Sequence, residues 1–341
     1  MLTKKLFAVL LTGFCCLAIA SSCFAEPDAK AAADAKTAGG EKGAAGEFAI
    51  YHVGNSLTGD LVFAFPQIAV PYEEAQGKSF RWGLHFRGAT ALSFMYAHPD
   101  DPKTTSTGAV NLGPRTWKKA GEEGYVPWTK ALVESHWDAV TLQPWQDDSR
   151  ATLKSDTEAV DGIIATARQR PDNATTKFYL YCPWTDTKYD DLNSFRKAFL
   201  TPIPDNPDQL AKPTRDYFRH VTDAVHKTHP DVAMIPAGEV HVALDEKMQA
   251  GKFEHFTSIR QLHRDVIHLN ALGSNVAAWT AYAVIFQKSP VGLPAVNLDK
   301  GMAQAPFETV REISPADLKL MQETVWEVVT SPDLKPYTLV P

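Results

Sequence analysis

Residues 48–58 read FAIYHVGNSLT, an apolar run that leads into Gly-Asn-Ser-Leu-Thr at positions 54–58. The apolar part, residues 48–53, has the length and the β-branched and aromatic content of a buried strand. A glycine and a serine directly after such a strand indicate a turn into a helix, with Ser56 at the carboxyl edge of a sheet. The same pattern also suits a serine that only caps the helix.

Further along the chain, strand-like apolar runs alternate with helix-like segments. Strands are expected at residues 80–86, 139–142, 178–182 and 232–235. Helices are expected at residues 61–76 (interrupted by Pro66 and Pro71), 128–135, 153–170, 214–227, 272–286 and 315–329. Strands that alternate with helices imply a parallel sheet with helices on both faces. We therefore predict an α/β fold, a three-layer α/β/α sandwich with a central, mostly parallel sheet, formed by residues 47–341 as one domain.

The composition excludes several classes of protein. The chain has 341 residues, of which 44% are hydrophobic and 22% charged, which excludes a polytopic membrane protein and a wholly disordered chain. With 34 Lys and Arg against 40 Asp and Glu, the net charge is −6, so the basic surface that nucleic acid requires is not expected. No segment repeats at a fixed period, which argues against solenoids and propellers.

The N-terminal residues 1–25 have the pattern of a secretory signal peptide. Lys4 and Lys5 precede an uncharged apolar stretch at 6–20, and Cys23-Phe24-Ala25 fits a cleavage site before Glu26. The protein is therefore expected to be exported, to the periplasm or outside the cell. Residues 26–46 contain mainly Ala, Lys, Asp, Glu and Gly and are expected to form a disordered, solvated linker.

The cysteines offer an alternative for the N-terminus and a constraint on the mature chain. Ala20-Ser21-Ser22-Cys23 resembles a lipobox, so lipidation of Cys23 would anchor the protein to a membrane. Cleavage after Ala25 would leave Cys182 as the only cysteine, which rules out an intramolecular disulfide bond. Cys182 ends an apolar run and is expected to be a buried structural thiol rather than a nucleophile.

A second chemical motif lies far downstream, at Asp265-Val-Ile-His268, directly before the apolar helix predicted at 272–286. An Asp and a His three residues apart can share one turn, so that the carboxylate accepts from one imidazole nitrogen. The other nitrogen can then take a proton from a serine, and Ser56 is the candidate. Taken alone, the motif equally suits a solvated Asp beside a surface His.

Two further segments end predicted strands at the same sheet edge. Gly88 follows the strand at 80–86 and offers a backbone N–H with little steric cover. Gln143 follows the strand at 139–142 and carries an amide. The N–H groups of Ser56 and Gly88, together with a glutamine amide, could surround a developing oxyanion. The alternatives are an ordinary glycine at a strand end and an amide that caps its strand.

Together these blocks resemble the SGNH hydrolase superfamily, also called the GDSL esterase/lipase group, over residues 48–287. Residues 54–57 match its Gly-Asp/Asn-Ser-Leu block, Gly88 its second block, and Asp265 with His268 its Asp-x-x-His block. The third block departs, because the family's Gly-x-Asn-Asp is replaced here by Gln-Pro-Trp-Gln-Asp at 143–147. Gln143 is the first choice to replace the missing Asn and Gln146 the second. The Gly-Asn-Ser-Leu-Thr and Leu-Gln-Pro segments are similar to those of an exported bacterial branch of the family.

The resemblance implies a flavodoxin-like fold and a serine ester hydrolase that needs no metal or organic cofactor. Ser56 would be the nucleophile, His268 the base and Asp265 its orienting acid. Exported relatives often deacetylate carbohydrates, so the expected substrate is a small-molecule or polysaccharide ester with an acetyl or other short acyl group. Asn55 and Trp145 are expected to bind it, and aromatic residues near the presumed rim suit stacking on a sugar: Trp82, Trp145, Trp184 and Tyr181.

Three alternatives remain at this stage. The altered third block also fits a weak or inactive carbohydrate-binding protein on the same fold. An unrelated exported α/β sugar-binding protein would make the Ser and Asp-x-x-His matches coincidental. Within the esterase hypothesis, His255 or His263 could be the base in place of His268, although only His268 has the Asp-x-x-His context.

Overall fold

A computed structural model describes residues 46–111, 118–144, 151–187, 191, 193–298 and 313–341, and these all belong to one compact unit, Ala38–Pro341. The expected signal peptide and all but the last residue of the expected linker lie outside the described residues, as do Trp145 and Gln146, so the expectations for these segments stay predictions. Within the described residues, no helix is both long and apolar enough to cross a membrane.

In the described part of the chain, seven strands form a single sheet in the order β4-β3-β2-β1-β5-β6-β7. The strands are β1 (Glu47–Gly54), β2 (Ser79–Phe86), β3 (Thr105–Asn111), β4 (Lys118–Lys119), β5 (Ala139–Leu142), β6 (Lys177–Tyr181) and β7 (Ala233–Ile235). Strands β2, β1, β5, β6 and β7, in that order across the sheet, run parallel to one another. At one edge β3 pairs antiparallel with β2, and β4 pairs antiparallel with β3. The prediction of a mostly parallel central sheet is thereby confirmed.

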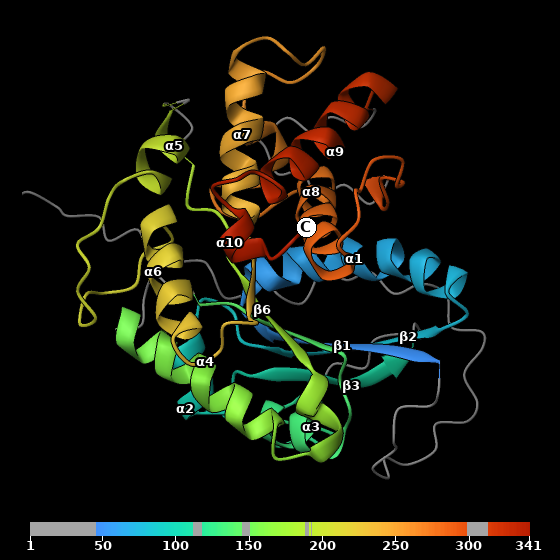
Figure 1. The fold of residues 1–341 in the computed structure, drawn as a ribbon, viewed down its shortest axis with the longest axis vertical. Helices are drawn as coiled ribbons and strands as arrows, with labels where there is room; N and C mark the ends of the chain where they lie inside the picture. The colour runs from blue at the N-terminus through green and yellow to red at the C-terminus, as the bar shows by residue number, and fades with distance from the viewer. Residues whose placement is uncertain (1–45, 112–117, 145–150, 188–190, 192, 299–312) are drawn as a thin grey trace, which may run out of the picture. The chain divides into compact units, whose positions relative to one another are not determined.

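Two groups of helices cover the sheet, which makes the fold a three-layer α/β/α sandwich (Figure 1). One group comprises α1 (Ser56–Ala75), α7 (Ala237–Gln249), α8 (Ala271–Phe286) and α9 (Pro315–Val329), which lie above the sheet in Figure 1. The other comprises α2 (Leu92–Ala97), α3 (Trp128–Glu134) and α4 (Leu153–Ala167) below it, with α6 (Arg215–His226) packed on α4. The remaining helical segments are short: η1 (Pro171–Thr175), α5 (Ser194–Phe199), η2 (Ile259–Leu262) and α10 (Lys335–Thr338).

Helix α8 is the inner helix of its layer. Its residues are buried from Ala271 to Val284, and it contacts α1, α7, α9 and β7. A helix that is apolar on all sides is stable only when it is enclosed, and these neighbours enclose it. Asn270 caps its first turn, where its side chain accepts from the Gly273 N–H at 3.0 Å. The Asp-x-x-His segment therefore leads directly into a rigid, buried helix.

Helix α1 differs from its prediction, which placed a helix at 61–76 interrupted by two prolines. It begins at Ser56 and continues through Pro66 and Pro71 to Ala75. Each proline removes one helical hydrogen bond, which disfavours an isolated helix. Packing of α1 along α8 and β2 outweighs that cost, so the helix stays continuous and carries the serine at its first position.

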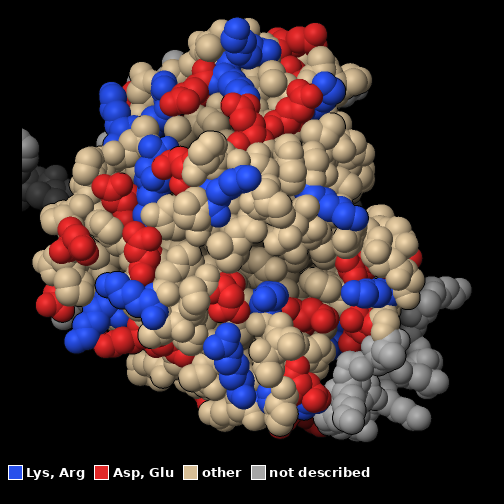
Figure 2. Space-filling model, viewed as in Figure 1, with Lys and Arg blue, Asp and Glu red and all other residues tan. Residues whose placement is uncertain are grey.

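Charged side chains of both signs are interspersed on the face drawn in Figure 2. On that face neither sign of charge forms a continuous field.

Candidate functional site

The carboxyl end of β1 turns directly into α1, and this turn presents Ser56. Asn55 is the N-cap of the helix, with its Oδ1 accepting from the Leu57 N–H at 3.0 Å. Ser56 is the first helical residue, so its own N–H has no acceptor within the helix. Ser56 is partly exposed, which leaves the hydroxyl accessible.

Three predicted residues meet at this turn. Ser56 Oγ lies 2.9 Å from His268 Nε2, and His268 Nδ1 lies 2.8 Å from Asp265 Oδ2. The second oxygen of Asp265 accepts from the backbone N–H groups of Ile267 at 2.9 Å and His268 at 2.7 Å, which fixes the carboxylate beside His268 Nδ1. The segments that carry the serine and the histidine lie 212 residues apart in sequence. The hydroxyl, imidazole and carboxylate thus form one hydrogen-bonded chain.

The charges around His268 favour its protonated form. Burial of the ring lowers its pKa, but the hydrogen bond to Asp265 and the negative charges of Asp60 and Asp265 outweigh burial, and the pKa is raised above the ordinary 6.5. For Asp265, burial raises the pKa, but bonding to His268 outweighs it and holds the pKa well below its ordinary value. At neutral pH the carboxylate is therefore ionised and stabilises an imidazolium, as a general base requires.

Gln143 does not have the role that the sequence predicted. It is fully buried, and its Nε2 donates to Asn55 Oδ1 at 2.8 Å. Its Oε1 accepts from Asn55 N at 3.2 Å, from Thr58 N at 3.0 Å and from the Thr58 hydroxyl. Both ends of the amide are engaged in shaping the turn between β1 and α1. Gln143 therefore holds the nucleophile turn in place, and because its side chain is fully buried, it presents no exposed amide to an oxyanion.

We expect Gln143→Ala to lower the free energy of unfolding by about 2 kcal/mol, because it leaves buried N–H and O–H donors of Asn55 and Thr58 without an acceptor. Urea unfolding followed by circular dichroism measures this difference. Gln169→Ala is the matched control, since Gln169 is exposed. Equal losses in the two variants would contradict the role of Gln143.

Gly88 lies in an exposed turn that is tied to the nucleophile turn. Arg87 N donates to Gly54 O at 3.2 Å, and Asn55 Nδ2 donates to Thr90 O at 3.2 Å. The Thr90 hydroxyl closes the turn by donating to Gly88 O at 3.0 Å. The backbone N–H groups of Ser56 and Gly88 remain the candidate oxyanion donors. Asn55, which was expected to bind substrate, is buried, and its side chain instead bonds to Leu57 and Thr90 and so shapes the turn.

The aromatic residues expected near the rim are mostly in the core. Trp82, Trp184 and Tyr181 are all buried, so they do not form a stacking surface for a sugar. Trp184 has a role that the sequence did not reveal: its Nε1 donates to Ile267 O at 2.6 Å and supports the segment that carries His268. The fourth aromatic, Trp145, lies outside the described residues, so its role as a binding residue stays a prediction.

The other candidate histidines have different surroundings from His268, and neither ring nitrogen of His263 has a hydrogen-bond partner within the described residues. His263 is buried, and His255 Nδ1 lies 3.0 Å from Asp317. Among the described residues, His255 also belongs to the one group of potential metal ligands, together with Glu254 and Asp317, whose ligand atoms lie within 4.8 Å of one another. The Asp317 carboxylate accepts hydrogen bonds from the backbone N–H groups of Glu254 at 2.8 Å and His255 at 3.1 Å. These bonds attach the start of α9 to the segment at 254–255, which explains why the three side chains lie together.

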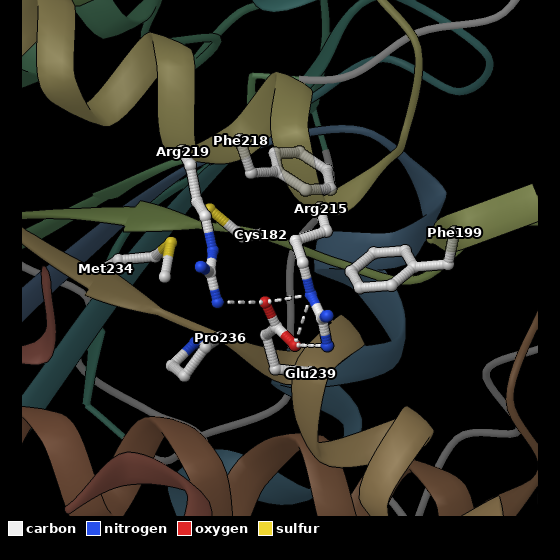
Figure 3. A pocket seen from close by; sticks show the side chains of 8 residues that line it. All are labelled: Cys182, Phe199, Arg215, Phe218, Arg219, Met234, Pro236 and Glu239. Carbon is white, nitrogen blue, oxygen red and sulfur yellow. Dashed lines mark hydrogen bonds and ion pairs between the residues drawn. The ribbon is translucent and has the colours of Figure 1, made fainter. Parts of the chain in front are cut away.

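A small cavity of about 10 Å³, room for roughly one water molecule, lies beyond the ends of β6 and β7 (Figure 3). Arg215 and Arg219 both point to Glu239 there, with Arg215 Nε 2.8 Å and Arg219 Nη2 3.0 Å from its carboxylate. Cys182 is buried in its wall, and burial and the Glu239 charge raise the pKa of the thiol. The described cysteine is thus a protonated packing residue, as predicted.

Comparisons with known proteins support the fold. No protein-family model matches the sequence, and no curated protein matches it. Among solved structures, the chain is similar to a DUF4886 family protein from Bacteroides uniformis, with a TM-score of 0.54 and 17% identity over 86% of this chain and 100% of that one. A Streptococcus pneumonia protein, provisionally described as a platelet activating factor, has a TM-score of 0.37 and 11% identity, covering 71% and 85%. At these identities the first similarity shows a shared α/β/α fold and nothing about activity.

Proposed function

We propose that this protein is a serine ester hydrolase that cleaves short acyl esters through Ser56, His268 and Asp265. The observation that carries the proposal is the continuous hydrogen-bonded chain from Ser56 Oγ through His268 to the Asp265 carboxylate. A partly exposed serine at a helix N-terminus, with an imidazole at 2.9 Å and an ionised carboxylate behind it, is the arrangement that activates a hydroxyl.

In the first half of the reaction, Ser56 Oγ attacks the ester carbonyl while His268 Nε2 takes the hydroxyl proton. The N–H groups of Ser56 and Gly88 stabilise the negative oxygen of the tetrahedral intermediate. The intermediate collapses to an acyl-serine, and His268 returns the proton to the leaving alcohol. In the second half, His268 takes a proton from a water whose oxygen attacks the acyl-serine carbonyl. The bond to Ser56 Oγ then breaks, His268 returns the proton to Ser56 Oγ, and the carboxylic acid leaves.

For the substrate we propose an acetyl or other short acyl ester, with an acetylated carbohydrate as the first alcohol to test. The family resemblance and the expected export support that choice, whereas the burial of Trp82, Trp184 and Tyr181 removes the stacking argument for these three residues. Trp145, which is expected at the rim, is the aromatic residue on which sugar stacking would depend.

The test is a kcat/KM series of p-nitrophenyl esters from acetyl to octanoyl, followed by acetate release from acetylated sugars. We expect turnover to be highest for the acetyl ester. A rate equal to the uncatalysed rate across the whole series would contradict ester hydrolysis. Turnover that rises steadily with acyl length would instead contradict the short-acyl assignment.

The pH dependence follows from His268. The base acts in its neutral form, and its pKa is raised above 6.5, so kcat/KM should fall on the acid side with a midpoint above that value. The measurement is kcat/KM for p-nitrophenyl acetate between pH 5 and 9, with circular dichroism at each pH as the control for unfolding. An acid limb below pH 6 in a folded protein would contradict the assignment of His268 as the base.

One observation favours a second function, ligand binding without turnover on the same fold. Gln143 gives its amide to Asn55, so the two backbone N–H groups of Ser56 and Gly88 would have to stabilise the oxyanion without it. The loss of one donor costs about a hundredfold to a thousandfold in rate in other serine hydrolases. Binding of acetylated sugar by calorimetry, with no acetate released over a day, would favour this alternative.

A further inference from the structure

We propose that Asp60 and Arg264 form a positioning pair that ties the loop carrying His268 to the helix carrying Ser56. This proposal rests on the proposed function only in that it takes His268 as the base. It has no counterpart among the motifs that the sequence singled out.

Asp60 lies on α1 four residues after Ser56, one helical turn further along the same face. Its Oδ1 accepts from Arg264 Nη1 at 2.8 Å, and its Oδ2 accepts from the Leu269 N–H at 3.0 Å. The Asp60 side chain is 4% exposed and that of Arg264 15% exposed. The carboxylate is therefore buried, with each oxygen bonded to the His268 loop.

Arg264 closes the loop from the other side. Its Nη1 donates to Leu269 O at 2.6 Å as well as to Asp60, and its backbone N–H donates to His268 O at 2.9 Å. The two peptide groups that follow the His268 side chain are thus bonded to Asp60 and Arg264. Because that ion pair rests on α1, the imidazole and the serine hydroxyl share one rigid support.

A buried ion pair is a costly way to hold two elements together, since both charges lose their hydration. Apolar residues of similar size could join α1 to the loop with a smaller desolvation penalty. They would neither accept the hydrogen bond from the Leu269 N–H nor carry a charge. The charges here act on His268: Asp60 raises its pKa and Arg264 lowers it. The other titratable groups facing the ring are Asp265 on its own loop and His263, whose pKa burial lowers to about 3.

The test separates this electrostatic positioning from a merely structural role. The His268 imidazole is titrated by NMR in the wild type, Asp60→Asn and Arg264→Gln, with its signal assigned by its absence in His268→Gln. We expect the His268 pKa to fall in Asp60→Asn and to rise in Arg264→Gln. Asp172→Asn, which removes an exposed carboxylate from the Arg170 ion pair, should leave it unchanged.

The same variants are assayed with p-nitrophenyl acetate. Both should lose about tenfold or more in kcat with little change in KM, because a displaced base slows the chemical step and not binding. Arg264→Lys keeps the charge and should restore the wild-type His268 pKa. If Asp60→Asn does not fold, the difference in His268 pKa between Arg264→Gln and Arg264→Lys still tests the proposal.

Shifts in the same direction for Asp60→Asn and Arg264→Gln, or no shift in either, would overturn the proposal. Where the Asp60 variant does not fold, equal His268 pKa values in the Gln and Lys variants of Arg264 would do so. Opposite shifts in a protein whose wild type hydrolyses no ester would reject the proposed function and leave the positioning pair standing.

Discussion

Ser56→Ala is expected to lower kcat/KM for p-nitrophenyl acetate by at least about a thousandfold, to a rate near that of the buffer. The variant keeps the two backbone N–H groups that would bind the oxyanion but removes the atom that attacks. Ser56 Oγ makes one hydrogen bond within the described residues, to His268, and the side chain is partly exposed. The free energy of unfolding should therefore stay within about 1 kcal/mol of the wild type.

A fluorophosphonate probe provides a second readout at the same atom. The wild type should form a covalent adduct that peptide mapping locates at Ser56, and Ser56→Ala should form none. Ser331→Ala is the matched control, because Ser331 is also a partly exposed serine but lies in the C-terminal segment. This substitution should change neither the ester turnover nor the labelling of Ser56. Full ester turnover in folded Ser56→Ala would refute the nucleophile, and with it the proposed function.

Gly54→Ala is expected to destabilise the protein by about 3 kcal/mol and to remove most of the ester turnover. A Cβ at position 54 would lie 2.0 Å from Thr58 Oγ1, 2.8 Å from Thr58 Cβ and 2.8 Å from Gln143 Oε1. Rotation of Thr58 would move its hydroxyl but not its Cβ, so the clash persists. The backbone must shift, which weakens the bonds to Gln143 and displaces the neighbouring Ser56.

Gly59→Ala, on helix α1 just after the nucleophile turn, is the matched control. Its Cβ would meet Phe86 at 3.5 Å, an ordinary contact, and alanine favours a helix interior over glycine by about 1 kcal/mol. Gly59→Ala should therefore be neutral or slightly stabilising in urea unfolding and should retain activity. Equal losses of stability and turnover in the two alanine variants would contradict the prediction that close packing around position 54 requires a glycine.

The parts of the fold that were predicted correctly are those with a strong local pattern. The strand at 48–53, the helix at 272–286 and the terminal helix at 315–329 correspond closely to β1, α8 and α9. The first two are largely apolar runs, and the third has apolar residues at helical spacing, so each type of element can be read from the local sequence. The order of strands and helices then implied a mostly parallel sheet, because the connections contain helices.

The missed elements lack such a pattern. Strand β3 reads Thr-Ser-Thr-Gly-Ala-Val-Asn, and it is held by antiparallel pairing to β2 rather than by an apolar run. Helix α7 begins with Ala-Gly-Glu one residue after β7 and has only a weak apolar stripe, although most of its residues are buried between neighbours. Long-range contacts stabilise both elements, and a local window of sequence does not contain them.

The sequence by itself determined the chain order of Ser56, Asp265 and His268 and the strand ends on which the serine and glycine blocks lie. These are local properties, set by where an apolar run stops and which residues follow. Only the tertiary structure decided that Gln143 bonds the nucleophile turn, that Trp184 supports the His268 loop and that Asp60 meets Arg264. Such pairings join residues up to 204 positions apart, and the direction of a buried side chain depends on every layer packed around it.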